Sequence, residues 1–501
     1  MRLGWNLIAA LGNSGASALI NVLATPFYLH FLGTEAYGLI GFFTTLMTLL
    51  AMLDLGLAPT ISREVARQVE LGDTRSAASL LATLERIYVV VAVGVGLLFL
   101  IGANWIAHSW LRTNHLSPID VAHAVMIMGI LAASRWPLTL YSGTLLGAQR
   151  LILLSKANIT MVAIGALGSV ALLRWVSPTI NVFFLWQAVV SLIYTTLMRR
   201  HAWNVIGYKG NSRFEISELK RIWRFSVGLG THTMTGAMLM QADKLALSKL
   251  VPLNIYGRYA LASLLAGGLY LLVMPTYNVL SPRFSALVAA GEDVRLLNLY
   301  RLSTRLLATL VFPVAMVVAL YAQPLVRVWT HDADLAAQVA PVLTLLIIGS
   351  ALHGVMFMPY ALQLAYGNAR LPLLINSLLL VIYMPLIIAF TLRYAEIGTA
   401  AAWLILHIFY VVVGAWLTHR YYLKHYAWRW VLKDVSIPVV SALSVGMAFL
   451  YFFGKSALAE ASLPMLILGI CVSGVGAVAI SLAFSPMLRS ALLSHFNPRH
   501  L

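Results

Sequence analysis

Four ionised side chains stand inside apolar stretches of this chain, and they are the residues best placed to do chemistry there: Asp54, Arg135, Asp243 and Lys244. A charge at the centre of a membrane helix costs about 2.5–3.5 kcal/mol on insertion scales, so each is a candidate functional residue. Arg135 lies near the middle of its stretch, next to Pro137, which can kink a helix and free a carbonyl. We expect Arg135 to face a central cavity and meet an anionic group. The alternatives are an ion pair with Asp54 or a bond to a carbonyl.

The other three charges sit nearer the ends of their stretches. Lys244 is about six residues from the expected outer end of its helix, so its stem could reach water. Asp243 is about 100° round the helix from Lys244, so we expect the two not to share a face. Asp243 either pairs with a base on a neighbouring helix or serves coupling. Asp54 either pairs with Arg63 and Arg67 to fix the helix exit, or acts as a protonatable gate or cation ligand.

Uncharged polar residues follow one face of the first apolar stretch. Asn13, Ser17 and Asn21 recur at every fourth residue, a spacing that keeps them on one slowly drifting face. Such a face lines a wet interface or serves helix packing, and we expect it to line the cavity. His232 and His353, on the seventh and tenth stretches, are further cavity candidates. A lone membrane histidine is otherwise a hydrogen-bonded packing residue.

Composition explains why these polar residues stand out. Of the 501 residues, 60% are hydrophobic and 10% are charged, and the mean hydropathy is +0.86. Apolar runs of about 20 residues recur, long enough to cross a hydrocarbon core of about 30 Å. This pattern predicts an all-α polytopic membrane protein, whereas a β-barrel would show alternating strands of about ten residues. The single cysteine, Cys471, excludes a disulfide framework.

We predict about 14 transmembrane helices joined by mostly short links. Of the 34 lysines and arginines, 25 fall on the N-terminus, the even-numbered links and the C-terminus, and 7 fall on the opposite side. The positive-inside rule therefore predicts that both termini are cytoplasmic. The net charge of +17 is then a topology signal, and we expect no nucleic-acid partner. The expected spans are 6–31, 37–59, 82–107, 121–147, 153–174, 179–198, 224–250, 256–280, 302–323, 338–365, 372–392, 397–418, 435–453 and 463–484.

Part of the sequence resembles a later part of the same chain when the two are aligned so that Tyr37 falls on Tyr256. We call this displacement the repeat shift. Each copy holds six expected helices, and an even number gives both copies the same orientation. The sequence thus predicts a parallel repeat of two six-helix bundles, an arrangement typical of secondary transporters, with the substrate site between the halves. The expected division is an N-terminal lobe at 1–200, a cytoplasmic linker at 201–223, a C-terminal lobe at 224–420, and two additional helices with a tail at 421–501. The aligned positions are Tyr37-Gly38 with Tyr256-Gly257, Gly72 with Gly291, Arg86 with Arg305 and, with one more residue of shift, 147–154 with 367–374.

The two copies resemble the half-signatures of a known family. FLGTEAYGLIGFF…LDLGLAPTISREVA and QADKLALSKLVPLNIYGRYALA are similar to the polysaccharide transport branch of the multidrug/oligosaccharidyl-lipid/polysaccharide flippase superfamily, over about 1–420. The resemblance implies a V-shaped pair of bundles that works by alternating access. It implies a flippase of the bacterial inner membrane that carries undecaprenyl-diphosphate-linked glycan, such as O-antigen or exopolysaccharide units, so that Arg135 and Lys244 would meet a diphosphate. Membrane lipid is a further partner. Whether other polysaccharide assembly proteins, or a coupling proton or sodium ion, are also partners stays an open question.

Two kinds of alternative remain. The first is a multidrug or lipid II transporter of the same superfamily, which would differ in substrate from a flippase for lipid-linked glycan. A membrane polysaccharide polymerase is the alternative of another class, but it would need a sizeable outer loop with paired carboxylates, and Asp332 and Asp334 stand in a short link. We find no Walker A loop, no metal-ligand spacing among the 13 histidines and no nucleophile constellation. We therefore expect no enzyme activity, cofactor or metal.

Overall fold

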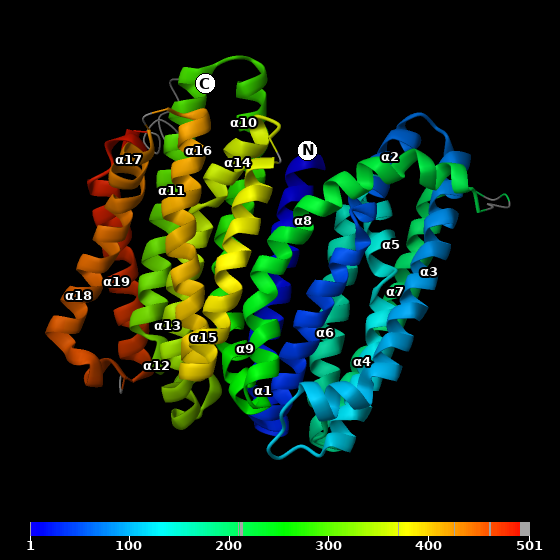
Figure 1. Cartoon of the computed structure of the whole chain (residues 1–501), viewed down its shortest axis with the longest axis horizontal. Coiled ribbons are helices and arrows are strands. Elements are labelled where there is room, and N and C mark those ends of the chain that lie inside the picture. Colours follow the sequence, from blue (N-terminus) through cyan, green and yellow to red (C-terminus); the bar gives the residue numbers. More distant parts are fainter. Residues whose placement is uncertain are drawn as a thin grey trace. The chain divides into compact units, whose positions relative to one another are not determined.

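The computed structural model is built from helices and divides into two compact units, Met1–Gly257 and Arg258–Leu501 (Figure 1). Among the described residues, ten helices are long and apolar enough to cross a membrane, or up to eleven if a bent pair counts as one span. The predicted all-α polytopic membrane fold is confirmed, while the count of 14 spans and the lobe boundaries stay predictions. The structure describes residues 2–208, 210, 214–368, 370–424, 426–459 and 462–490, without the side chains of 2–11, 218–219, 221–233 and 455–459.

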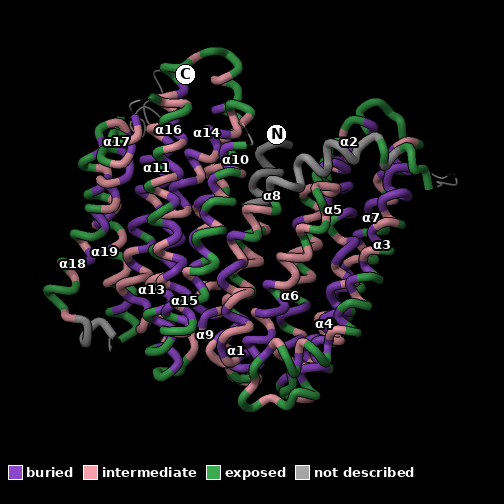
Figure 2. Tube along the Cα trace, viewed as in Figure 1, coloured by how far each residue is buried: buried purple, intermediate pink, exposed green. Residues whose placement is uncertain are grey.

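Among its described residues, the first unit contains eight α-helices and the start of a ninth (Figure 1). Buried residues recur along these helices (Figure 2), and leucine, valine and alanine are common among them. The elements are α1 (Arg2–Leu50), the 3₁₀ helix η1 (Ala51–Asp54), α2 (Leu57–Glu70), α3 (Thr74–Trp105), the π-helix η2 (Ile106–Trp110), α4 (Pro118–Arg135), α5 (Leu138–Gly147), α6 (Leu151–Trp175), α7 (Ile180–Ile206), α8 (Ile216–Leu250) and the first turn of α9 (Leu253–Gly267).

In its described part, the second unit continues α9 and adds ten further α-helices with two π-helical turns. Its last two long helices, α18 and α19, pack against each other and against α11. The elements are α10 (Tyr270–Ala289), α11 (Asp293–Leu320), α12 (Ala322–Thr330), α13 (Ala333–Val355), α14 (Phe357–Ala365), α15 (Arg370–Phe409), η3 (Tyr410–Gly414), α16 (Ala415–Tyr422), α17 (Ala427–Arg429), η4 (Trp430–Val435), α18 (Ser436–Ala459) and α19 (Leu463–Ala483).

Two apolar helices are each long enough for two spans, and each contains a backbone break. Helix α1 has 49 residues, about 74 Å at 1.5 Å per residue, and Gly33 interrupts it at φ 77° and ψ 171°. Helix α15 has 40 residues and breaks at Tyr394 and Ala395. Gly33 and Ala395 have positive φ, and the chain turns at these residues without a loop. These breaks correspond to the predicted boundaries between spans one and two and between spans eleven and twelve.

One predicted span boundary is wrong. The sequence predicts a second span that runs to residue 59, but α1 ends at Leu50, and the left-handed residues Leu55 and Gly56 separate η1 from α2. Helix α2 is amphipathic, burying Ile61 and Val65 on one side, so it is a short separate helix and not the end of a span. The linker expected at 201–223 stays a prediction, and the structure shows that α7 continues to Ile206 and α8 begins at Ile216.

The repeat is visible in the backbone as well as in the sequence. The pairs α3 and α11, α5 and α14, and α6 and α15 each begin at positions that the repeat shift matches. Gly72 and Gly291, which the same shift aligns, have φ of 70° and 68° and follow the ends of α2 and α10. A left-handed glycine ends a helix without the steric penalty of a Cβ atom. The same residue type therefore ends the same helix in both copies.

The two copies of the repeated hairpin tip meet each other through glycine. A Cβ atom on Gly38 would lie well inside 3.0 Å of the Leu253 carbonyl oxygen, and one on Gly257 would lie equally close to the Thr34 carbonyl oxygen. Gly38 matches Gly257 and Thr34 matches Leu253 under the repeat shift, so the contact is reciprocal. The hydroxyl groups of Thr45 and Tyr256 hydrogen bond beside it at 2.9 Å. We call these residues the glycine crossing.

Replacing either glycine of the crossing should destabilise the protein. Gly38→Ala or Gly257→Ala forces a methyl group against a backbone carbonyl, and overpacking of this kind costs about 1–3 kcal/mol. We expect a lower thermal unfolding midpoint of the purified protein in detergent. Gly94→Ala is the matched control, because a Cβ atom there meets nothing within 4 Å. An unchanged midpoint in both crossing variants would show that the backbones separate easily.

Candidate functional site

Arg135 stands where the fourth apolar stretch is broken in two. It is the last residue of α4, and Trp136 and Pro137 separate it from α5. A proline has no N–H to donate, and its ring clashes with the carbonyl four residues earlier, so the helix breaks at this point. The stretch 118–147 has the length of one apolar span. Arg135 lies near the middle of that stretch, and its role there stays a prediction.

The neighbours of Arg135 are neutral. Its Nη2 atom lies 3.5 Å from Gln187 Oε1 on α7, and its guanidinium carbon lies 5.9 Å from the centre of the Phe43 ring on α1. Within the described part of the chain, no carboxylate lies within 4.0 Å of its nitrogens, so the alternative of an ion pair with Asp54 is wrong. An amide oxygen and an aromatic face stabilise a cation without cancelling its charge. Arg135 thus remains a positive charge with spare donors.

Gln187 holds its oxygen toward Arg135 because its nitrogen is occupied elsewhere. Its Nε2 atom donates to the Gly165 carbonyl at 3.3 Å and to Ser169 Oγ at 3.1 Å, both on α6. The neighbouring Ser134 hydroxyl donates to Ser191 Oγ at 2.7 Å. These bonds tie α4, α6 and α7 together around the guanidinium. The position of Arg135 is therefore supported by a second layer of polar contacts.

Asp54 caps a helix and does not pair with the arginines that follow it. Its Oδ2 atom accepts the Ala58 N–H at 3.1 Å in the first turn of α2, and its Oδ1 atom accepts the Tyr88 hydroxyl from α3. Arg63 and Arg67 instead bind Glu64, at 3.1 and 3.0 Å. The predicted alternative of an ion pair between Asp54 and these arginines is wrong. A carboxylate is favoured at a helix N-terminus by the helix dipole and the free N–H groups.

Asp243 and Lys244 form an ion pair, contrary to the expectation that neighbours on a helix keep apart. Lys244 Nζ lies 3.3 Å from Asp243 Oδ2 and 3.4 Å from the Met240 carbonyl. The four-carbon lysine stem curls back along the helix and spans the angle of about 100° between the two positions. Asp243 is 1% exposed, whereas the Lys244 side chain is 23% exposed. The lysine is therefore the accessible member of the pair.

The polar stripe of α1 faces α6 in part. Asn158 Nδ2 donates to Asn13 Oδ1 at 2.8 Å and to Ser17 Oγ at 3.1 Å. Asn21 is exposed and its amide donates to the Ser17 carbonyl. Asn13 and Ser17 thus serve helix packing, whereas Asn21 is exposed. His232 lies outside the described side chains, and the cavity-lining role of the stripe stays a prediction.

His353 belongs to an aromatic cluster in the second unit. Its Nδ1 atom and the Tyr270 hydroxyl lie 2.7 Å apart, and its ring centre lies 4.8 Å from that of His407. His407 is buried and its Nδ1 atom hydrogen bonds the Trp403 carbonyl at 2.8 Å. The repeat shift aligns His353 with Ser134, and both residues flank a helix break. The hydrogen-bonded surroundings fit the packing alternative, and a cavity role stays a prediction.

Sequence reasoning missed three polar residues that organise the first unit. Gln187 and Asn158 are uncharged, so a search for ionised residues passes over them, although each is polar within an apolar helix. Glu35 stands at the repeated hairpin tip, where the sequence gives it no evident role. Its buried carboxylate accepts the backbone N–H groups of Asn114 and His115 at 2.6 and 2.9 Å. It therefore fixes the link between α3 and α4 to the tip.

Comparison with known proteins identifies the family. A family model described as polysaccharide biosynthesis protein matches residues 4–288, more than half of the chain. The chain belongs to the polysaccharide biosynthesis protein family. It is 20% identical over 420 residues to a Shigella flexneri protein named "Putative O-antigen transporter", covering 83% of this chain and 96% of that protein. The predicted polysaccharide transport family is thus confirmed.

Two solved structures share the fold of this polysaccharide biosynthesis family member. The lipid II flippase MurJ, in an inward closed conformation, matches with a TM-score of 0.69 at 14% identity, over 96% of this chain and 98% of that one. An inward-facing multidrug resistance MATE transporter of the MOP superfamily matches with a TM-score of 0.64 at 14% identity, over 82% and 96%. At this identity the likeness establishes the fold, and the chain is a multi-pass membrane protein of that type.

Removing the amide that joins α1 to α6 should loosen the first unit. Asn158→Ala deletes both bonds from Nδ2 to the polar stripe, and interhelical hydrogen bonds of this kind contribute about 0.6–1 kcal/mol each. We expect a loss of about 1–2 kcal/mol, measured as a lower unfolding midpoint in detergent. Thr196→Ala is the control, because that exposed hydroxyl bonds only within its own helix, to Leu192. Equal midpoints for the two variants would contradict a packing role for the stripe.

Proposed function

We propose that this protein is a flippase that moves undecaprenyl-diphosphate-linked oligosaccharide from the inner to the outer leaflet of a bacterial inner membrane by alternating access, for O-antigen or exopolysaccharide synthesis. The family membership supports a role in polysaccharide biosynthesis. The observation that carries the substrate class is Arg135, a cation in an apolar span whose described neighbours are neutral. Such a group is costly to keep unless it serves an anion.

A diphosphate needs replacement partners while it crosses the bilayer. It is strongly hydrated, and bare passage through hydrocarbon would cost all of that hydration. A guanidinium offers several N–H donors in a planar fork that matches phosphate oxygens, and Gln187 leaves most of those donors of Arg135 free. Charge-assisted hydrogen bonds contribute about 1.5–3 kcal/mol each. We therefore assign Arg135 as the main headgroup contact.

Lys244 is the weaker of the two proposed contacts. Its Nζ atom already pairs with Asp243, so an incoming phosphate must compete with a carboxylate. The 23% exposure of its side chain leaves room for that exchange. If the phosphate takes Lys244, the buried Asp243 carboxylate loses that cationic partner and could take up a cation in its place. This supplies one route to proton coupling, and a sodium ion at the carboxylate is the other.

The remaining parts of the proposal concern orientation and partners. The surplus of lysine and arginine on one side supports two cytoplasmic termini. Outward movement of an anion is downhill in an inside-negative membrane. The lipid-linked glycan and the surrounding lipid are then the partners, together with other polysaccharide assembly proteins. The matched relatives are transporters, and we assign no catalytic residue.

A lipid II flippase is the second candidate, because one observation favours it. The MurJ structure matches 96% of this chain, whereas the multidrug transporter matches 82%. The two candidates share the diphosphate chemistry and differ in the glycan. Depletion of the protein separates them, since loss of surface glycan with normal growth supports the polysaccharide flippase. Arrested growth with failure of the cell wall would support the lipid II flippase instead.

Neutralising both cations should abolish transport without removing the protein. In Arg135→Gln/Lys244→Gln, the headgroup loses its charge-assisted partners, and we expect at least a tenfold fall in transbilayer movement of the lipid-linked glycan in proteoliposomes. Arg135→Gln alone should lose more than Lys244→Gln, since Lys244 is already paired. The readout is glycan accessible to an external enzyme, normalised to reconstituted protein.

A matched pair of variants controls for net charge. Lys156 and Arg174 are exposed at opposite ends of α6. Lys156→Gln/Arg174→Gln therefore also removes one lysine and one arginine charge, but at positions other than Arg135 and Lys244. This control should transport at the wild-type rate. Full transport by the Arg135/Lys244 double variant, at normal protein levels, would defeat the proposed headgroup contacts. The family assignment would stand, because it does not depend on these residues.

Membrane potential should drive the substrate outward. Each negative charge gains about 2.3 kcal/mol per 100 mV on moving to the positive side. In proteoliposomes with a potassium gradient and valinomycin, we expect the lipid-linked glycan to accumulate in the positive leaflet. Reversing the gradient should reverse the accumulation. An equal distribution at both polarities would show that transport is electroneutral and needs an exchanged cation.

A further inference from the structure

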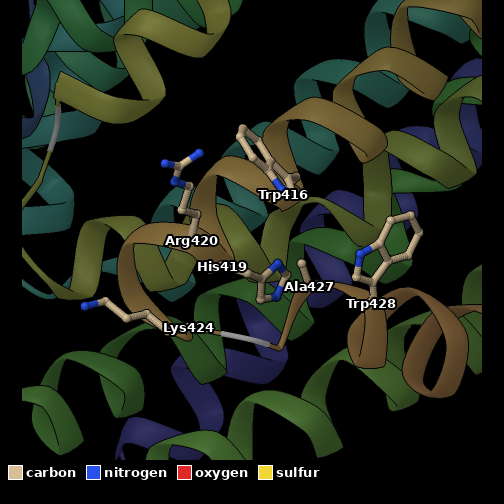
Figure 3. Close-up of a pocket in the computed structure, with 6 residues that line it drawn as sticks. All are labelled: Trp416, His419, Arg420, Lys424, Ala427 and Trp428. Atoms are coloured by element: carbon tan, nitrogen blue, oxygen red, sulfur yellow. The ribbon is translucent and has the colours of Figure 1, made fainter.

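A basic and aromatic pocket lies at the junction between α16 and α17 in the second unit (Figure 3). It has a volume of about 480 Å³. Arg420, Lys424 and the two tryptophans are exposed, whereas His419 is buried at its base. In Figure 3 the Arg420 and Lys424 side chains extend on the same side of the helix. The lining residues are Trp416, His419, Arg420, Lys424, Ala427 and Trp428.

The charged residues that line this pocket, Arg420 and Lys424, are both basic. Residues 416–433 contain two arginines and two lysines and no aspartate or glutamate. The nearest acid in sequence, Asp434, is fully buried, and its two oxygens accept bonds from Arg305 Nε and the Tyr426 hydroxyl, both at 2.5 Å. It therefore offers no counter-charge to the pocket. An anion arriving from outside is attracted by Arg420 and Lys424, and no carboxylate is among the described residues that line the pocket.

The pocket walls are held in place by buried polar contacts. The Arg305–Asp434 pair anchors η4 to α11, and Trp430 Nε1 donates to Thr304 Oγ1 at 3.3 Å. Burial, and then the bond to Asp434, raises the pKa of Tyr426, so its hydroxyl stays protonated and donates. These contacts fix the chain on both sides of Ala427 and Trp428. The pocket is thus a built part of the fold.

His419 belongs to the wall and is not a ligand. Its Nδ1 atom hydrogen bonds the Ala415 carbonyl at 2.6 Å, and its Nε2 atom lies 3.0 Å from the Tyr300 hydroxyl. Both ring nitrogens are therefore occupied. The guanidinium of Arg420 stacks over Trp416, with its carbon 5.2 Å from the ring centre, which leaves the N–H edge free to bind oxygen. Arg420 and Lys424 are the two groups able to bind an anion.

The pocket also lies between the ends of two candidate membrane spans. The candidate spans Arg370–Tyr422 and Ala427–Gly454 end and begin at the pocket, so it stands at a membrane–water boundary. Tryptophan beside arginine or lysine is the composition that proteins place at that boundary. Trp416 and Trp428 are 46% and 74% exposed, as side chains in contact with lipid would be. A resident phospholipid can therefore reach the pocket laterally, without leaving the bilayer.

We propose that this pocket binds the phosphate headgroup of an anionic phospholipid, with Arg420 and Lys424 on the phosphate and the two tryptophans against the glycerol and upper acyl carbons. A lipid bound in the pocket would connect the C-terminal end of α16 with α17, which leads into the additional helices α18 and α19. The site is separate from Arg135 and Lys244, so it stands independently of the transport proposal. Phosphatidylglycerol is the probe that tests it.

The direct test is lipid binding to the purified full chain by native mass spectrometry. Wild-type protein should bind phosphatidylglycerol more tightly than phosphatidylcholine. Because each basic residue near an anionic lipid strengthens binding about fivefold, Arg420→Gln/Lys424→Gln should weaken phosphatidylglycerol binding roughly 30-fold. Phosphatidylcholine binding should not change. The charge-conserving variant Arg420→Lys/Lys424→Arg should remain near the wild-type affinity.

Arg75→Gln/Arg150→Gln is the matched control, since both residues are exposed and belong to the first unit. It should bind phosphatidylglycerol like wild type. Undiminished phosphatidylglycerol binding by Arg420→Gln/Lys424→Gln would overturn the proposal. Full competition by inorganic phosphate at equal concentration would also overturn it, by showing a site for soluble anions.

A second measurement needs no variant and so survives a folding failure. A photoactivatable phosphatidylglycerol, reconstituted with wild-type protein in vesicles of phosphatidylcholine, should label peptides containing Trp416 or Trp428. Excess unlabelled phosphatidylglycerol should remove that label, whereas excess phosphatidylcholine should not. Labelling confined to other helices would contradict the assignment.

Discussion

The close approach of two backbones at Gly38 and Gly257 is the constraint on which the rest of the first unit depends. Each glycine lies against a carbonyl of the other hairpin tip, so neither tip tolerates a side chain at that position. The contact brings α8, the first helix of the second copy, against α1 of the first copy, and the compact unit accordingly ends at Gly257. Lys244 and Asp243, on α8, therefore belong to the same packed body as Arg135. Glu35, in the same tip, ties in the link between α3 and α4.

A consistent pattern of charge follows from this packing. Three of the acids discussed above each have a partner, since Asp54 caps α2, Asp243 pairs with Lys244, and Asp434 binds Arg305. Arg135 instead faces an amide and an aromatic ring. The described interior of the first unit therefore offers a cation more readily than an anion. This asymmetry favours an anionic substrate, and an exporter of cationic drugs would need the opposite arrangement.

The sequence predicts the large features well because they depend on one-dimensional patterns. Hydropathy identifies a polytopic helical protein, and the repeat shift locates helix starts that the structure reproduces at α3 and α11. It fails where a local contact competes with the pattern. Apolar residues continue past Leu50, but Leu55 and Gly56 adopt left-handed conformations that end the span. Lys244 reaches Asp243 through rotations of its stem, which helix geometry alone does not describe. Gln187 carries no charge, so its role beside Arg135 depends on packing that no single-chain pattern encodes.

The central claim is that Arg135 recognises a diphosphate, and binding to the purified protein tests it most directly. Undecaprenyl diphosphate, undecaprenyl monophosphate and undecaprenol share one tail and differ only in negative charge. The account predicts that affinity falls in that order for wild-type protein, and that Arg135→Gln removes most of the difference between diphosphate and alcohol while tail binding persists. Equal affinity of wild-type protein for all three, or an unchanged preference in the variant, would contradict it.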